Sequence, residues 1–188
     1  AIAQAALDAG AEVSLITAPT NLAPPVGCKV FPVKSSAEML AEVKSSIVNS
    51  DVLIMAAAVS DFRPVHTSTQ KIKKSGSGIE IQLESTTDIL AEVAKIRESA
   101  SNPRFVIGFA AESQNLLNNA AEKLKKKKLD MIVANDITAS DAGFEVDTNR
   151  VTFIYADGHH QSMPLQSKAD VAEKVIEQVI EWFGKEPG

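Results

Sequence analysis

Three lysines near the middle of the chain, Lys71, Lys73 and Lys74, have the charge and the spacing to contact a phosphate group. Basic residues in an ordered loop neutralise phosphate charge and stabilise a departing pyrophosphate. A KIKK sequence is by itself more typical of a solvated loop or sheet edge. The phosphate interpretation gains support from the position of the loop. It begins at the end of the predicted strand over 51–58, at the segment that carries Asp61.

A second group of lysines lies on a predicted helix over residues 113–128. Lys123 and Lys127 are four residues apart, so they share one helix face and together could clamp a polyphosphate. A solvated helix surface explains Lys123, Lys125, Lys126, Lys127 and Lys128 equally well. Both interpretations of this helix therefore stay open from the sequence.

The histidines and the cysteine do not form a metal-binding or nucleophilic pattern. His66, His159 and His160 have no metal-ligand spacing with one another or with Cys28. There is also no nucleophile elbow and no plausible Ser-His-Asp order. Hydrolase and zinc-enzyme functions are therefore unsupported, and no residue is assigned as a metal ligand.

Strands that alternate with helices must position these residues. We expect helices over 1–9, from Ser36 to 48, from Thr86 or Thr87 onward, over 113–128 and near the C-terminus. Strands are expected over 12–17, 29–33, 51–58, 78–84, 105–110 and 131–134, with a hairpin over 151–155 and 161–165 around Asp157-Gly158. This order predicts one α/β domain over residues 1–188, a Rossmann-like three-layer fold with a mostly parallel sheet and a β-hairpin extension.

In open α/β sheets, ligands bind beyond the carboxyl ends of the strands. This rule selects the segments 57–61, 108–112 and 134–136, each a run of small or polar residues after a buried strand. Small side chains allow a ligand to approach the backbone, whose amides and carbonyls can then recognise a base. The alternative is that these alanines merely fit tight turns between strands and helices.

The overall charge limits the partners. The chain has 19 Lys and Arg against 24 Asp and Glu, a formal net charge of −5, which argues against a general nucleic-acid binder. No apolar run approaches the roughly 20 residues that span a bilayer. The first residues lack the pattern of a signal peptide. We therefore expect a soluble cytoplasmic protein without membrane partners.

The beginning of the chain resembles the middle of a larger α/β unit. Residues 1–9 have the pattern of a helix that ends at Gly10, without a preceding cap or strand. The strand and turn before the first helix of such a domain usually carry the phosphate-binding loop. We expect that a first strand and a glycine-rich loop precede this helix in the intact protein.

Five motifs lie in register along the chain: MAAAVSDFRP at 55–64, KIKK at 71–74, TTDIL at 86–90, VIGFAAES at 106–113 and LDMIVAND at 129–136. Together they resemble the bacterial phosphopantothenate–cysteine ligase (phosphopantothenoylcysteine synthetase) family. The resemblance implies a ligase that activates the carboxylate of 4'-phosphopantothenate with CTP as an acyl-cytidylate. The amine of L-cysteine then displaces CMP. It also implies Mg²⁺, which neutralises charge on the attacked phosphate and on the pyrophosphate.

The same resemblance assigns residues and partners. Lys71 would contact the triphosphate and assist the first step. The nucleotide site would include Ala57, Ala58, Asp61, Thr87, Asp88, Ile89, Leu90, Phe109, Lys123 and Lys127. The family is dimeric, with residues near the intersubunit β extension completing the active site, so a homodimer is expected. It is also often fused to a flavin-dependent decarboxylase. The family's acyl-cytidylate asparagine lies before this chain and is assigned to no residue, so this polypeptide is expected to fail at complete turnover.

Two other functions stay open. An NAD(P)-dependent oxidoreductase shares the fold class but leaves the lysine cluster and the AVSDF segment unexplained. A non-catalytic dimerisation or scaffold fragment would bind no nucleotide. The sequence does not decide between CTP and ATP, because base selection depends on backbone geometry.

Overall fold

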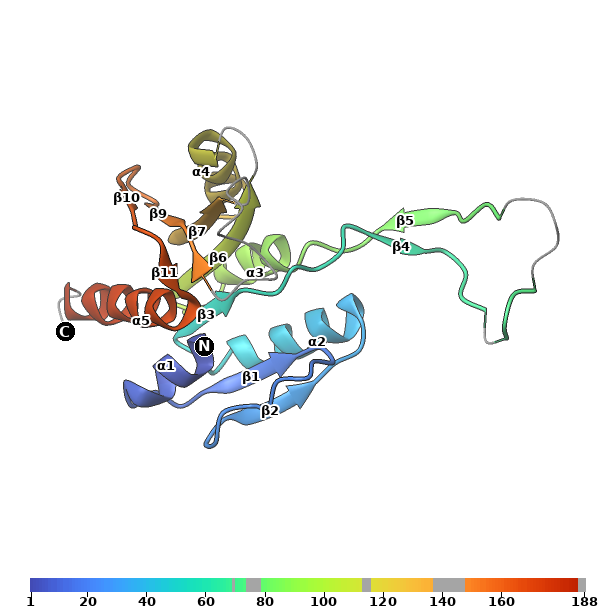
Figure 1. The fold of residues 1–188 in the computed structure, drawn as a ribbon, viewed down its shortest axis with the longest axis horizontal. Coiled ribbons are helices and arrows are strands. Elements are labelled where there is room, and N and C mark those ends of the chain that lie inside the picture. The colour runs from blue at the N-terminus through green and yellow to red at the C-terminus, as the bar shows by residue number, and fades with distance from the viewer. Residues whose placement is uncertain (69, 74–78, 113–115, 137–147, 186–188) are drawn as a thin grey trace.

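A five-stranded sheet with the order β10-β9-β7-β6-β3 forms the centre of the molecule (Figure 1). The computed structural model describes residues 1–68, 70–73, 79–112, 116–136 and 148–185. Pairing is parallel from β3 to β7 and antiparallel from β7 to β10. The strands are β3 (Val52–Met55), β6 (Phe105–Glu112), β7 (Met131–Asp136), β9 (Val151–Tyr155) and β10 (His160–Ser162). The α/β fold with a mostly parallel core is therefore confirmed.

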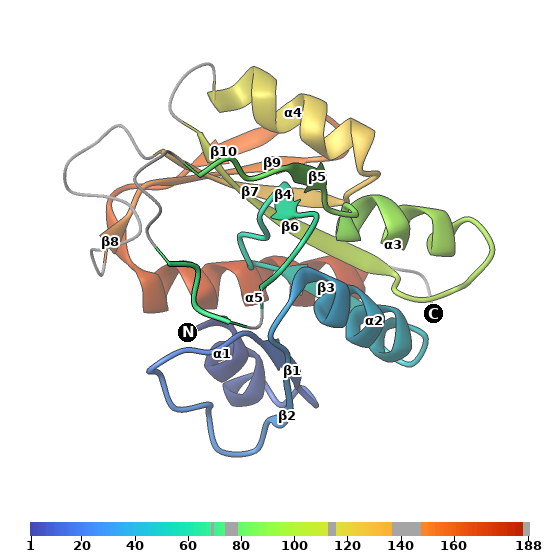
Figure 2. The ribbon, with the colours of Figure 1, turned by 90° about the vertical axis from the view of Figure 1, so that its right-hand side faces the viewer.

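Helices cover both faces of this sheet, which makes three layers (Figure 2). Because side chains alternate along a strand, Val106 and Ala110 of β6 join one core cluster, whereas Phe105 and Ile107 join the other. The first cluster lies under α2 (Ser36–Ile47), α3 (Ile89–Arg97) and α4 (Leu116–Lys126), and the second under α5 (Lys168–Lys185).

A separate two-stranded parallel sheet contains β1 (Ser14–Thr17) and β2 (Lys29–Pro32). It lies beside α1 (Ile2–Asp8), which packs against α5 (Figure 1). In the described part of the chain, β1 pairs only with β2, and β3 pairs only with β6. One edge of β1 and one edge of β3 therefore have no strand partner among the described residues.

The predicted hairpin is present at the edge of the central sheet, and a second strand pair, which was not predicted, projects from the body. The hairpin β9–β10 forms around Gly158, at φ 92°, but it extends the central sheet. The projecting arm contains β4 (Phe62–Pro64) and β5 (Leu83–Ser85), which lie on either side of the lysine segment (Figure 1). The sequence prediction missed this pairing because it joins segments about 20 residues apart. The remaining short pair contains β8 (Thr148–Asn149) and β11 (Gln166–Ser167).

Two helix caps also differ from the prediction. Ser35, rather than Ser36, caps α2, because its side chain accepts a hydrogen bond from Glu38 N. Asp88, rather than Thr86 or Thr87, caps α3 by accepting from Ala91 N. Serine, threonine and aspartate are all good N-caps, so local composition alone does not choose among neighbours.

Gly108 lies where α3 and the loop after α4 approach β6 most closely. A Cβ atom at Gly108 would come within 2.7 Å of Leu129 Cδ1 and 3.5 Å of Leu90 Cδ1. Both leucines are buried, so neither can move away without disturbing its neighbours. Glycine is therefore required here for packing between helix and sheet.

We expect Gly108→Ala to lower the free energy of unfolding by about 1–3 kcal/mol, the usual cost of overfilling a packed core. Urea denaturation followed by circular dichroism measures the change. Gly184→Ala is the matched control, because no atom lies within 4 Å of a Cβ at this helical position. That variant should be neutral or slightly stabilised. Equal effects of the two substitutions would contradict the packing argument.

Candidate functional site

The segment that follows β3 lies at the carboxyl edge of the central sheet. Regular structure ends at Met55, earlier than the predicted strand over 51–58, and residues 56–61 are irregular until the arm begins at Phe62. Ala57, Ala58 and Asp61 are exposed. Because β3, β6 and β7 are parallel, their carboxyl ends point to the same edge. The structure thus presents an accessible backbone where α/β sheets usually bind ligands.

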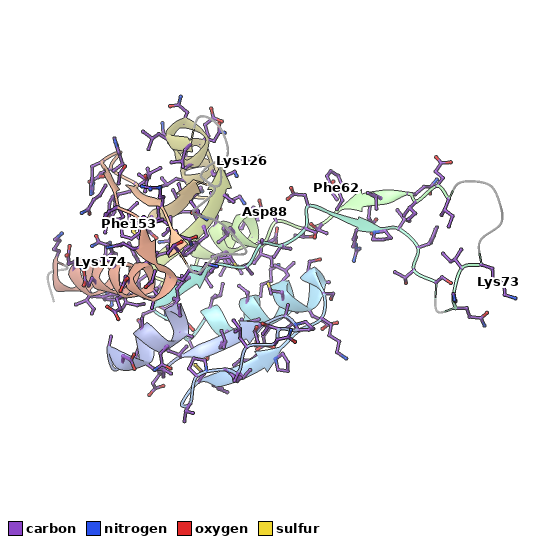
Figure 3. The ribbon with its side chains drawn as sticks, in the orientation of Figure 1. Phe62, Lys73, Asp88, Lys126, Phe153 and Lys174 are labelled. Carbon is purple, nitrogen blue, oxygen red and sulfur yellow. The ribbon has the colours of Figure 1, made fainter. Side chains whose placement is uncertain are left out.

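The beginning of α3 meets the end of α4 beside this edge. Asp88 uses one carboxylate oxygen to cap α3, with Oδ1 3.2 Å from Ala91 N. Its other oxygen, Oδ2, lies 3.1 Å from Lys127 Nζ. The first turn of a helix carries unpaired N–H groups and a partial positive charge. Asp88, Lys127 and the helix terminus therefore form one polar cluster, and Asp88 lies where the arm joins the body (Figure 3).

The two lysines predicted to clamp a polyphosphate keep their helical relation. The helix α4 ends at Lys126, but Lys127 N still donates to Lys123 O over 2.9 Å. Lys123 is exposed, whereas the side chain of Lys127 is only 26% exposed. The structure therefore supports Lys123 and Lys127 as neighbours on one side of the cluster that contains Asp88.

Three predicted site residues contribute to packing. Ile89 and Leu90 are 3% and 8% exposed and belong to the core beneath α3, so only their backbone faces the edge. Phe109 is half-buried and packs with the cluster under α5, on the face of the sheet opposite Leu90. The side chain of Phe109 is therefore separated by the sheet from the Asp88–Lys127 pair. Thr87 is exposed next to Asp88.

Lys71 lies far from these groups within the same chain. It is exposed and belongs to the outer part of the arm, where the neighbouring Lys73 is drawn well away from Asp88 (Figure 3). Lys74 lies outside the described residues. The structure therefore does not bring Lys71 together with Lys127 or with the segment after β3 in a single copy of the chain.

Two residues of the site were assigned no role in nucleotide binding from the sequence. Thr86 bonds to the backbone of Ser60 and Asp61, so it joins the segment after β3 to the beginning of α3. Asn135 follows Ala134 at the end of β7, and its Oδ1 is buried without a hydrogen-bond partner. The edge rule had selected Asn135 as part of the 134–136 segment. Thr86 had been named only as a possible helix cap and as part of the TTDIL motif.

The described residues contain no group of three or more His, Cys, Asp or Glu side chains that could hold a metal ion. A magnesium ion at this edge therefore fits only if substrate phosphates supply most of its oxygen ligands, as is usual for Mg²⁺. Within the same residues, no helix is long and apolar enough to cross a membrane.

A mostly parallel sheet with polar groups at its carboxyl edge defines an α/β class of protein in which ligands commonly bind at that edge, and the family comparison specifies the class further. Residues 1–183 match the family described as the DNA/pantothenate metabolism flavoprotein C-terminal domain. The chain belongs to this family, so the resemblance predicted from the motifs is confirmed at that level.

Similar proteins agree with this assignment. The coenzyme A biosynthesis bifunctional protein CoaBC of Bacillus subtilis (strain 168) is 41% identical over 95% of this chain and 43% of its own length. CoaBC of Vibrio cholerae serotype O1 (strain ATCC 39315 / El Tor Inaba N16961) is 39% identical over 96% of this chain and 45% of its own. The crystal structure of the C-terminal domain of CoaBC has a TM-score of 0.81 at 34% identity, covering 98% of this chain and 81% of that one. The chain spans less than half the length of these curated relatives.

The position of α3 depends on an ion pair between the half-buried Glu92 and Lys44 of α2. Glu92 Oε2 lies 2.7 Å from Lys44 Nζ of α2, and Glu92 Oε1 also pairs with Lys95. Hydrogen bonds from Lys44 and Lys95 lower the pKa of Glu92 from 4.5 to about 2. The folded state therefore favours the ionised form of Glu92, which ties α3 to α2.

We expect Glu92→Gln to reduce the free energy of unfolding at neutral pH. Because the pKa is depressed on folding, the contribution of Glu92 is complete above about pH 4.5 and is lost as pH falls towards 2. Thermal unfolding of both proteins between pH 2 and 7 should show a difference that disappears over this range. Glu177→Gln, which removes an exposed ion pair with Lys174 on α5, is the control. A difference that stays constant with pH would contradict this role.

Proposed function

We propose that this chain is the synthetase part of a coenzyme A biosynthesis protein and joins 4'-phosphopantothenate to L-cysteine with CTP. The observation that carries the proposal is the polar cluster of Asp88 and Lys127 beside the exposed segment 57–61, at the carboxyl edge of the sheet. The family match and the names of the CoaBC relatives support the reaction. The fold alone would not, because α/β folds host many activities.

In this proposal the nucleotide lies between two segments of the chain, residues 57–61 on one side and residues 87–90, at the beginning of α3, on the other. Ala57, Ala58 and Asp61 offer backbone groups to the base and sugar, because small side chains leave that backbone accessible. Lys127 and Lys123 face the phosphates from α4. The beginning of α3 adds unpaired N–H groups, which favour anions. Magnesium bound to the triphosphate would neutralise charge as pyrophosphate departs. The protein's own part is to orient the nucleotide against the pantothenate carboxylate.

The arm supplies the argument for a homodimer. Its register places Phe62, Pro64 and Leu83 on one face, and the alternation continues through Ile81 to Ile79. Phe62, Leu83 and Ile81 are 59%, 57% and 63% exposed. The opposite face carries the Arg63–Glu84 ion pair, at 2.8 Å. A two-stranded ribbon with an apolar face is not stable alone in water. We propose that a second copy covers this face, and that Lys71 then reaches the nucleotide site of that copy.

The remaining parts of the proposal concern the intact protein. We propose that a further parallel strand fills the space between the free edges of β1 and β3, with the phosphate-binding loop after it. The name "bifunctional protein" of the relatives, and their greater length, support a fused decarboxylase domain. A cytoplasmic location agrees with this biosynthetic role.

Calorimetric titration with CTP, ATP and NADPH in magnesium buffer tests the nucleotide. We expect selective binding of CTP. In the intact protein, with the expected phosphate-binding loop present, Lys71→Ala should lower the rate of pyrophosphate release by about 10²–10³-fold, the usual effect of removing one group that stabilises transition-state charge. Its free energy of unfolding should change by less than about 0.5 kcal/mol, since Lys71 is exposed. Binding of NADPH alone would indicate an oxidoreductase, and binding of no nucleotide would favour a scaffold.

Light scattering tests the dimer. We expect Ile81→Asp to give monomers, because a charge on the apolar face opposes its burial. Gln82→Asp places the same charge on the opposite face and should leave the dimer intact. In the intact protein, a 1:1 mixture of the Lys71→Ala and Lys127→Ala variants should recover roughly a quarter of the activity, because half the dimers are mixed and each then has one intact site. A monomeric wild-type protein at micromolar concentration would reject the arrangement.

A further inference from the structure

Thr86 connects two parts of the site that are far apart in the sequence. Its backbone N–H donates to Asp61 O over 2.8 Å. Its hydroxyl group donates to Ser60 O in a short hydrogen bond. Thr86 itself is half-buried and lies between β5 and the cap of α3 at Asp88.

The segment after β3 has few other attachments. In the described part of the chain, residues 56–61 belong to no helix or strand, and Val59 is their one side chain packed against the core. Within the described residues, the backbone carbonyl groups of Ser60 and Asp61 each accept one hydrogen bond from Thr86. Segments with few buried contacts and few hydrogen bonds open readily. Thr86 therefore sets how closely this segment is held to α3.

We propose that Thr86 is a positioning residue that holds two segments of the nucleotide site, residues 57–61 and 87–90, at the separation needed for binding. This inference rests on the proposed function, because it concerns the same site. Thr86 itself makes no contact with the nucleotide; it acts through the carbonyl groups of Ser60 and Asp61. A ligand that binds only the closed arrangement has an apparent affinity reduced by the fraction of molecules that are open.

The hydroxyl group is the part of Thr86 that can be tested separately. Thr86→Val keeps the shape of the side chain and the N–H bond to Asp61 but removes the donor to Ser60. Thr86→Ser keeps the donor and removes only a methyl group. A single hydrogen bond is worth a factor of about 2–10 in an equilibrium between closed and open forms. The expected effects are therefore modest and require both variants.

Arg63→Gln is the matched control. It removes the ion pair with Glu84, which joins β4 to β5 two positions further along the arm than the contact of Thr86 with Asp61. It leaves Ser60, Asp61 and Thr86 intact. A general loosening of the arm would affect Arg63→Gln and Thr86→Val alike, whereas positioning of the site affects only Thr86→Val.

Two measurements test the inference. Amide hydrogen exchange, followed by mass spectrometry, should show exchange about 2–10-fold faster in the peptide that carries the Thr86 N–H, which donates to Asp61 O, in Thr86→Val, but not in Thr86→Ser or Arg63→Gln. Calorimetry with CTP should show an affinity lower by a similar factor in Thr86→Val alone. The exchange measurement needs no nucleotide.

The outcomes separate this inference from the proposed function. Unchanged exchange in Thr86→Val would overturn the positioning role, even if the wild-type protein binds CTP. Faster exchange with unchanged CTP affinity would also overturn it, because the hydrogen bonds of Thr86 would then have no effect on nucleotide binding. If the wild-type protein binds no CTP, the proposed nucleotide function fails, and the role in nucleotide positioning fails with it.

Discussion

The parallel pairing of β3 with β6 and of β6 with β7 is the constraint on which the site depends. Parallel strands need a crossover after each strand, and each crossover begins at the carboxyl end. The connections that leave β3 and β6 therefore start at one edge, where the exposed segment 56–61 lies. The helices α3 and α4 return across one face and bring Asp88 to Lys127. These polar groups are far apart in the sequence, and without this register they would not lie close together in the structure.

Packing between the sheet and these helices has little tolerance. Gly108 leaves room for Leu90 and Leu129, and this close approach places the first turn of α3 near the sheet. The same residues that follow Asp88 in the sequence, Ile89 and Leu90, are buried in the core. One short sequence thus contributes both a polar cap and a hydrophobic anchor. This explains why Ile89 and Leu90, although they belong to the TTDIL motif, have a structural role.

The two faces of the arm formed by β4 and β5 differ in polarity. Its polar face is closed by the Arg63–Glu84 pair, while Phe62, Leu83 and Ile81 remain exposed on the other. An apolar surface of this kind on a narrow ribbon is characteristic of an interface. The lysine segment at the outer end would then act at a distance from its own sheet. A site completed by a second copy reconciles the position of Lys71 with the role that the sequence motif implies.

Several features follow from the sequence by itself. Apolar runs predicted the strands at 105–110 and 131–134, and periodicity predicted α2, α3 and α5, because local burial patterns reflect the layers of an α/β fold. The edge rule selected the segments after β3 and β7. The positions of Lys71 and Phe109 were decided only by the tertiary structure. The arm pairs residues about 20 positions apart, and which face of β6 a side chain occupies depends on the register of the whole sheet. The bonds of Thr86 to Ser60 and Asp61 likewise exist only after the strands of the arm have paired, so no local pattern could indicate them.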